Sequence, residues 1–318
     1  MARYANEFGP HAPAATYVAH EYDERLFNTG EAEINYVTAG DASKPALLLI
    51  PGQTESWWGY EDAMPALAEH FQAYAVDLRG QGRSTRTPGR YTLDNMGNDL
   101  VRFMDLVVRR PTIVSGLSSG GVLTAWLSAY ARPGQVVGAY YEDPPLFASQ
   151  TRPATGQGID QSIGPVFALF SKYLGDQWSI GDWDGLVAAV PDELPPTLGL
   201  IAGALGASGE PPQSLKEYDP EWARAFSSGS VCAGCDHVRM LASVKVPVLF
   251  SHHFRMIDES TGTLLGAITD LQVERVRQLV TDGGNPFEYV SLPAMGHSLH
   301  GQDPALYVET LVGWAASL

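Results

Sequence analysis

The pentapeptide Gly116-Leu117-Ser118-Ser119-Gly120 has residue types and spacing that can present a reactive hydroxyl. It follows a short β-rich run, Pro111 to Val114, and precedes a stretch with helical character. A G-x-S-x-G sequence between a strand and a helix puts its serine on a sharp turn with the hydroxyl exposed. The pattern alone is common in a chain with 33 glycines, so the rest of the sequence must support it. Ser118 is therefore a candidate nucleophile.

A serine hydroxyl is a weak nucleophile, so it needs a base, and the base needs an acid that holds it in the correct tautomer. The chain offers both, in the order serine, acid, histidine: Asp143 follows the apolar run Val136–Tyr141, and His297 follows Phe287–Leu292. The carboxyl ends of parallel strands meet at one edge of a sheet. We therefore expect Ser118, Asp143 and His297 to converge there, with His297 as base and Asp143 as acid.

The acid is the member of this set that the sequence leaves open. Asp258 follows the next β-rich run, Val246–Phe250, and could equally orient the imidazole of His297. Glu142 adjoins Asp143 and offers a carboxylate at nearly the same place. Asp143 is the favoured choice and Asp258 the alternative, because the chemistry needs only a carboxylate within hydrogen-bond reach.

Attack by Ser118 on a carbonyl would create a negatively charged oxygen, which fixed N–H donors must stabilise. One donor is expected from the amide after the nucleophile, that of Ser119, and the other from the loop after an earlier strand. That loop is Pro51-Gly52-Gln53, directly after the apolar run Ala46–Ile50. We therefore predict the backbone N–H groups of Gln53 and Ser119 as an oxyanion hole. The alternative is that Pro51-Gly52 only ends a strand.

Short apolar runs alternate with helical patterns over most of the chain, which predicts an α/β fold with a parallel sheet. The expected strands are 46–50, 73–76, 113–114, 136–141, 246–250 and 287–292, and Arg25–Val37 is expected to form a hairpin. Thr92 stands where a helix over Leu93–Val107 would need its N-cap. Asp303-Pro304 marks the start of the last helix.

The alternation stops after Pro145 and resumes at Val246, a gap too long for an ordinary connection. We expect an inserted helical cap over residues 146–240, with the core formed by 1–145 and 241–318. Aromatic residues are frequent in the cap: Phe167 and Phe170 with Leu174 at helical spacing, and Trp178, Trp183 and Trp222. Most of them should pack within the cap, and one or two should face a ligand.

Composition excludes several classes of partner. A net charge of −16 and a pI near 4.8 oppose nucleic acid and anionic membrane surfaces, and no leader or membrane-spanning pattern is seen. We expect a soluble cytoplasmic protein without cofactor or metal, since dense metal-ligand motifs such as H-E-x-x-H do not occur. Cys232 and Cys235, with His237 nearby, are expected to be ordinary thiols and not a redox pair or half a zinc site. The His252-His253 pair is expected to be inert.

The segment Asp77-Leu78-Arg79-Gly80-Gln81-Gly82-Arg83-Ser84 matches the D-x-R-G-x-G-x-S turn of the α/β-hydrolase superfamily, which the chain resembles over almost its whole length. That resemblance implies a mostly parallel eight-stranded sheet flanked by helices, with a helical cap. Three further segments are similar to the actinobacterial zearalenone-lactone hydrolases, namely residues 175–183, 216–222 and 48–58.

The second resemblance implies a serine hydrolase that opens the ester of a resorcylic macrolactone through an acyl-enzyme. Ser118, Asp143 and His297 match that family's triad, and Trp183 is assigned to its substrate-contacting cap tryptophan. Trp178, Leu146 and Phe147 complete the predicted substrate-binding set. The partner is then a small lactone or ester.

Other functions remain open at this point. The same fold hosts general carboxylesterases and carbon-carbon hydrolases, because function lies in the site and not in the scaffold. A third class is a receptor that keeps the triad but turns its ligand over very slowly. Repeated hydrolysis of a generic ester separates the enzymes from the receptor. The sequence also leaves open whether the chain forms a homodimer.

Overall fold

The central sheet is built from short and mostly apolar strands. The computed structural model describes residues 19–199 and 211–318. Its strands are β1 (Arg25–Asn28), β2 (Glu33–Ala39), β3 (Ala46–Ile50), β4 (Gln72–Val76), β5 (Thr112–Leu117), β6 (Val136–Glu142), β7 (Val248–His252), β8 (Arg255–Asp258), β9 (Thr263–Gly266) and β10 (Phe287–Ser291). Eight of them form one sheet in the order β1-β2-β4-β3-β5-β6-β7-β10, while β8 and β9 pair separately. The pairings of β2 with β1 and with β4 are antiparallel and the other five in this sheet are parallel, so the predicted mostly parallel eight-stranded sheet is confirmed.

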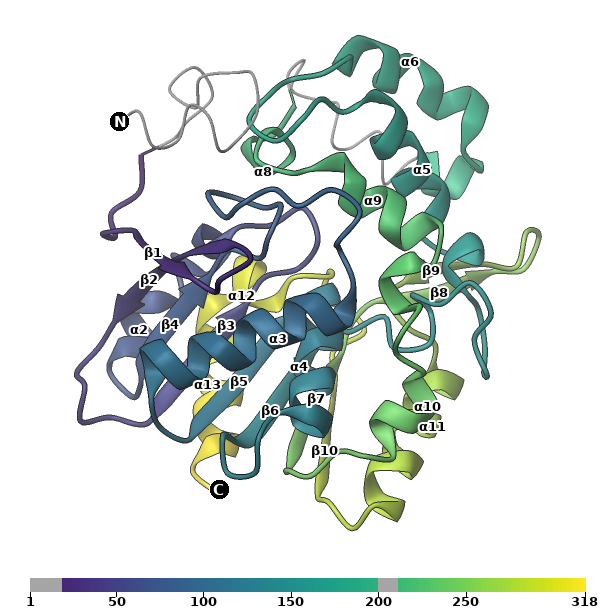
Figure 1. The fold of residues 1–318 in the computed structure, drawn as a ribbon. Coiled ribbons are helices and arrows are strands. Elements are labelled where there is room, and N and C mark those ends of the chain that lie inside the picture. The colour runs from purple at the N-terminus through teal and green to yellow at the C-terminus, as the bar shows by residue number, and fades with distance from the viewer. Residues whose placement is uncertain (1–18, 200–210) are drawn as a thin grey trace.

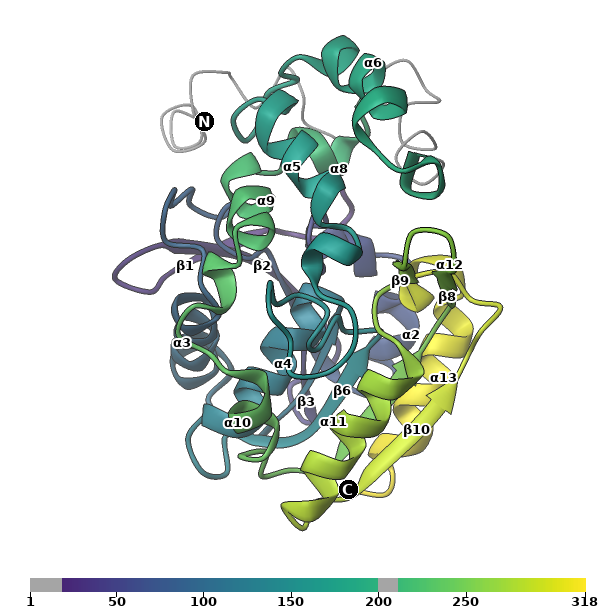
Figure 2. The same ribbon diagram turned by 90° about the vertical axis from the view of Figure 1, so that its right-hand side faces the viewer.

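Helices cover both faces of this sheet (Figures 1 and 2). On one face lie α3 (Leu93–Phe103), α4 (Ser119–Tyr130), α10 (His237–Leu241) and α11 (Asp270–Asp282); on the other lie α2 (Met64–Ala68), α12 (Leu299–Gln302) and α13 (Pro304–Ala315). The predicted caps are present: the Thr92 side chain accepts from Asn95 N, and Asp303 accepts from Leu306 N. A π-helical turn, Met104–Val108, extends α3.

Strand β3 shows why this sheet needs helices on both faces. All five of its residues are at most 1% exposed. Because side chains alternate along a strand, Leu48 and Ile50 belong to one hydrophobic core, whereas Leu47 and Leu49 belong to the other. The continuous apolar run is thus the sequence of a strand buried on both sides.

The segment between β6 and β7 forms a cap beyond the carboxyl ends of the strands (Figure 1). Its main helices are α5 (Gly164–Tyr173), α6 (Trp183–Glu193), α8 (Gln213–Lys216) and α9 (Pro220–Ser227). The predicted boundary at residue 240 falls within α10, which packs on α4 and α11 of the core. The β8–β9 hairpin, whose last β8 residue is Asp258, was not expected from the sequence pattern.

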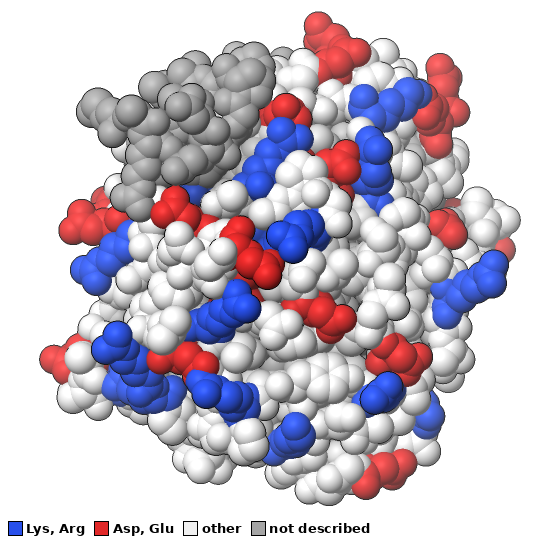
Figure 3. All heavy atoms as spheres, in the orientation of Figure 1, with Lys and Arg blue, Asp and Glu red and all other residues white. Residues whose placement is uncertain are grey.

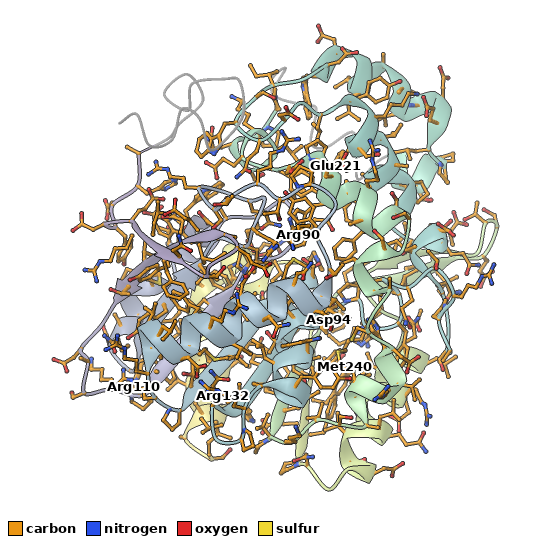
Figure 4. The ribbon with its side chains drawn as sticks, in the orientation of Figure 1. Arg90, Asp94, Arg110, Arg132, Glu221 and Met240 are labelled. Carbon is orange, nitrogen blue, oxygen red and sulfur yellow. The ribbon has the colours of Figure 1, made fainter. Side chains whose placement is uncertain are left out.

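Charges of both signs are mixed over the face shown in Figure 3. Figure 4 places Arg90 and Asp94 near the start of α3 and Arg110 beyond its other end, and Arg132 forms an ion pair with Asp105. Neither residues 19–199 nor 211–318 contain a helix long and apolar enough to cross a membrane.

Close packing of α4 against β3 predicts a stability cost at Gly120. An added Cβ there would lie 2.3 Å from Ile50 O, so backbone must move. Gly120→Ala should lower the free energy of unfolding by about 1–3 kcal/mol, as measured by urea denaturation.

Gly313→Ala is the matched control, since Gly313 lies in helix α13 with no atom within 4 Å of an added Cβ. Its expected effect is a gain of up to about 1 kcal/mol, from the higher helix propensity of alanine. Equal effects of the two substitutions would contradict the packing argument.

Candidate active site

Ser118 occupies the turn between β5 and α4 in a strained conformation. Its φ of 54° and ψ of −120° lie outside the regions that non-glycine residues favour. Neighbouring glycines allow the turn to be this tight: an added Cβ at Gly116 would lie 2.4 Å from Gly120 O, and one at Gly121 would lie 2.9 Å from Gly116 O. Strand, turn and helix thus have the arrangement that exposes a nucleophilic serine, and Ser118 is partly exposed.

The Pro51-Gly52-Gln53 segment lies beside this turn. An added Cβ at Gly52 would be 3.3 Å from Ser118 Cβ, so only a residue without a side chain fits comfortably here. In the described part of the chain, the backbone N–H groups of Gln53 and Ser119 donate to no other group. Both donors are thus free beside the serine, and Ser119 N also lies at the positive end of the α4 dipole.

Asp143 and His297 meet as the strand order requires. His297 Nδ1 lies 2.7 Å from Asp143 Oδ2, and Asp143, which follows β6, is 1% exposed. With Nδ1–H donating to the carboxylate, Nε2 remains as the proton acceptor. Within residues 19–199 and 211–318, no hydrogen bond joins His297 to Ser118 Oγ; such bonds often form only with substrate.

The two other carboxylates serve different groups. Asp258 Oδ1 accepts from Ser260 in its own turn, and its Oδ2 lies 3.3 Å from Thr197 Oγ1. Glu142 Oε2 lies 2.8 Å from His300 Nδ1. Of the three acids that the sequence offered, Asp143 is the one hydrogen-bonded to the His297 ring.

His253 forms hydrogen bonds with both Asp143 and His297. Its backbone N–H donates to Asp143 Oδ1 at 3.1 Å, and its Nδ1 lies 2.9 Å from His297 O. Its Nε2 is 2.9 Å from Ser251 Oγ, to which Tyr140 donates. The sequence pattern assigned this histidine no part in the site, and in the structure it contacts both partners of the Asp143–His297 hydrogen bond. No local sequence pattern indicates this role, since the contacts join three separate strand ends.

The charge around His297 favours its protonated form. Loss of hydration opposes this, but the hydrogen bond to Asp143 and the charges of Asp143, Glu142 and Glu55 outweigh it and raise the pKa of His297. The side chain is 48% exposed, so solvent weakens the opposing effect of burial. The imidazole is therefore a stronger base than a free histidine.

The predicted substrate-binding residues have different surroundings. Trp178 is 1% exposed and its Nε1 donates to Gly82 O at 2.8 Å, so it ties cap to core. Leu146 and Phe147 are fully buried in the turn after Asp143. Trp183 is 6% exposed, and its Nε1 has no partner among the described residues. Trp183 is the member of this set with an unused donor.

The cysteine pair shows no reactive character. Both thiols are free, and burial raises the pKa of Cys232 and of Cys235 to about 12, so neither forms a thiolate near neutral pH. His237 Nδ1 accepts from Phe147 N, and its Nε2 lies 3.5 Å from Cys232 Sγ. The described ranges contain no group of three or more His, Cys, Asp or Glu side chains that could hold a metal ion.

The amino-acid sequence is similar to those of known proteins over most of its length. A family model described as "Alpha/beta hydrolase family" matches residues 47–310, which include the whole sheet from β3 onward. The chain belongs to the alpha/beta hydrolase family. Among curated relatives, fluoroacetate dehalogenase from Burkholderia sp. is 26% identical over 292 residues, covering 87% of this chain and 88% of that protein.

Other relatives match over shorter regions. The 3-oxoadipate enol-lactonase 2 of Acinetobacter baylyi is 28% identical over 102 residues, which are 31% of this chain and 38% of that protein. The match to epoxide hydrolase 4 of Mus musculus, 30% identical, covers 32% of this chain and only 29% of that relative's length. The chain thus spans about a third of the length of these relatives.

Solved structures agree on the fold. The enol-lactonase from Burkholderia xenovorans superposes with a TM-score of 0.63 at 16% identity, covering 92% of this chain and 100% of that chain. A protein from Burkholderia cenocepacia that is provisionally described as an aryl esterase superposes with a TM-score of 0.62 at 16% identity. The match covers 93% of this chain and 98% of that chain. At this level of identity the likeness concerns the fold alone.

Substitution of the two aspartates distinguishes their roles. Asp143→Asn should leave the chain folded but lower kcat for ester hydrolysis on the order of 10³–10⁴-fold, because the amide no longer selects the tautomer with a free Nε2. Asp258→Asn should leave kcat unchanged. Steady-state kinetics with phenyl acetate checks both, and a large loss in the Asp258 variant would reverse the assignment.

The pH profile follows from the raised pKa of His297. A general base must be neutral, so activity should disappear as pH falls through this pKa. Because the pKa of His297 is raised from 6.5, the acidic limb of kcat/KM should have its midpoint above pH 6.5. A midpoint below that value would exclude His297 as the titrating base.

Proposed function

We propose that the protein is a cofactor-free serine hydrolase that opens the ester bond of a macrolactone of the zearalenone type through an acyl-enzyme. The observation that carries the proposal is the Asp143–His297 hydrogen bond at the sheet edge where Ser118 occupies a strained strand-to-helix turn. Membership of the alpha/beta hydrolase family supports hydrolysis. The lactone substrate and the roles of individual residues are our inference.

In the first half-reaction, Ser118 Oγ attacks the lactone carbonyl carbon while His297 Nε2 takes the hydroxyl proton. The carbonyl oxygen becomes an oxyanion, which the N–H groups of Gln53 and Ser119 stabilise. Asp143 stabilises the imidazolium without taking its proton. When the tetrahedral intermediate collapses, the ring C–O bond breaks and His297 gives its proton to the leaving alkoxide. The product is an ester of Ser118 that still carries the opened chain.

In the second half-reaction, water replaces the alcohol. His297 Nε2 removes a proton from water as its oxygen attacks the acyl carbon, and the same oxyanion hole receives the charge. Collapse breaks the bond to Ser118 Oγ, which recovers its proton from His297. The released product is a hydroxy acid, and the enzyme returns to its starting state.

Three features support a large and mostly apolar lactone as substrate. The cap is rich in aromatic residues, and Trp183 Nε1 is an unused donor among the described residues. The segments that resemble zearalenone-lactone hydrolases meet at the junction of cap and core: Tyr218 OH lies 2.5 Å from Gln53 Nε2, and Glu217 accepts from Ser56 at 2.7 Å. An enol-lactonase is among the relatives.

A general carboxylesterase is the second candidate, favoured by the aryl esterase among similar folds. It differs from a lactonase in its preference for linear esters. A carbon-carbon hydrolase would cleave neither class efficiently, and a receptor would bind without repeated turnover. Mass spectrometry of products from zearalenone, smaller lactones and phenyl esters separates these possibilities.

The adjacent serines provide a matched pair for testing the mechanism. Ser118→Ala should reduce turnover of every substrate in the panel by at least about 10⁴-fold while binding remains nearly intact. Ser119→Ala should retain activity, because its backbone N–H is kept and its buried Oγ has no partner in the described structure. Full activity of the Ser118 variant would refute the mechanism, whereas a preference for linear esters would refute only the lactone substrate.

A further inference from the structure

A second histidine, His300, lies three residues after His297 and bridges two buried carboxylates. Its Nδ1 is 2.8 Å from Glu142 Oε2, and its Nε2 is 3.0 Å from Glu55 Oε1. The side chains of His300 and Glu142 are fully buried, and that of Glu55 is 18% exposed. The His300 ring stacks on Tyr60 with centroids 3.8 Å apart, which fixes its plane between the two acids.

The bonding pattern requires a charged ring. A carboxylate accepts hydrogen bonds and donates none, so each ring nitrogen that faces one must carry a proton. Both carboxylates also accept from backbone: Glu55 from Gly52 N at 2.9 Å, and Glu142 from Leu299 N at 2.8 Å. These bonds favour the ionised acids, and the ring between them is then an imidazolium.

The Glu55–His300–Glu142 bridge connects the loops that carry the proposed catalytic groups. Glu55 holds Gly52 N–H, one residue before the Gln53 amide of the oxyanion hole. Glu142 adjoins Asp143 in sequence and accepts from the N–H groups of Leu299 and His300, which follow His297. One cation thus links the oxyanion loop, the end of β6 and the histidine loop, three segments far apart in the chain.

We propose that His300 is a permanently protonated positioning residue that holds the oxyanion-hole loop in register with His297 and Asp143. The proposal rests on the serine hydrolase function set out above. His300 does not touch the reacting atoms: it acts through Glu55 on Gly52 and through Glu142 on the loop of His297. Its positive charge also offsets two carboxylates whose fields reach His297.

The surroundings of His300 agree with this state. Besides Glu142 and Glu55, the ring faces Tyr60, Tyr307 on α13 at a centroid distance of 5.6 Å, and Ser298 Oγ at 3.4 Å. Burial opposes protonation, but the two carboxylates outweigh it and raise the pKa of His300 to about 10. His300 should therefore stay protonated over the pH range in which His297 changes from imidazolium to neutral base.

Kinetics of His300→Gln test the positioning role. Misplacing an oxyanion donor weakens transition-state binding more than ground-state binding. We expect kcat for phenyl acetate to fall by about tenfold or more while KM changes less than about threefold. His70→Gln, at an exposed histidine, should leave both constants unchanged. Wild-type kcat in a folded His300 variant, verified by thermal unfolding, would overturn the proposal.

Charge substitutions on either side of the bridge give a readout that simple loss of packing would not move. His300→Gln removes a positive charge near His297, so its pKa rises and the acidic limb of kcat/KM shifts to higher pH. Glu55→Gln removes a negative charge, so the limb shifts to lower pH. Opposite shifts support the proposal, and unchanged limbs or shifts in the same direction overturn it.

The charge of His300 can also be measured without substrate. Nitrogen NMR of the full chain labelled with ¹⁵N-histidine, assigned by comparison with His300→Gln or Glu55→Gln, should show both His300 nitrogens protonated at pH 7. A neutral ring at pH 7 would overturn the proposal. If wild-type protein hydrolyses no ester, the proposed function fails instead, while the NMR result still decides the charge.

Discussion

The backbone at Ser118 must turn from β5 into α4 within one residue, and the remaining parts of the site are built around that turn. A positive φ on a serine costs on the order of 1–3 kcal/mol, and the surrounding strand and helix hold it in place. Close approach of Gly116, Gly120 and Gly52 to neighbouring backbone or to Ser118 makes the turn sterically possible. Thr54 and Asp143, on the two adjoining loops, also have positive φ. Strain is thus concentrated where the proposed chemistry requires fixed geometry.

Behind this turn, buried polar groups are arranged as linked pairs. Asp143 faces His297, and His253 fixes both of them, while Glu142 and Glu55 face His300. Each carboxylate is held by backbone N–H groups as well as by a histidine, which compensates for its lost hydration. The side chain of His297 is 48% exposed, whereas that of His300 is fully buried. The exposed ring is accessible for the proposed proton transfer, whereas the buried ring is suited to the proposed positioning role.

The cap is joined to the core through the same loops. Trp178 bonds Gly82, Tyr218 bonds Gln53, and Trp222 Nε1 donates to Arg79 O at 2.6 Å. These hydrogen bonds hold the cap over the strand ends. Because Tyr218 contacts Gln53, the cap is physically connected to the loop that supplies a proposed oxyanion donor. The lactone proposal depends on this enclosure, and it leaves Trp183 as the cap residue best suited to contact a ligand.

The sequence by itself determined the elements that local chemistry dictates. Apolar runs such as Ala46–Ile50 define buried strands, Thr92 and Asp303 begin helices, and the glycine-flanked Ser118 marks a tight turn. The expected convergence of Ser118, Asp143 and His297 followed from the carboxyl ends of parallel strands, which share one edge of the sheet. Tertiary structure alone decided which acid faces His297, because the sequence places Asp143 and Asp258 after successive strands but does not give the distance of either from the imidazole. It likewise decided the contacts of His253 and His300, whose partners are up to 245 positions away. Such contacts require separate loops to be placed relative to each other to within a few tenths of an ångström. No periodicity along the chain encodes that placement.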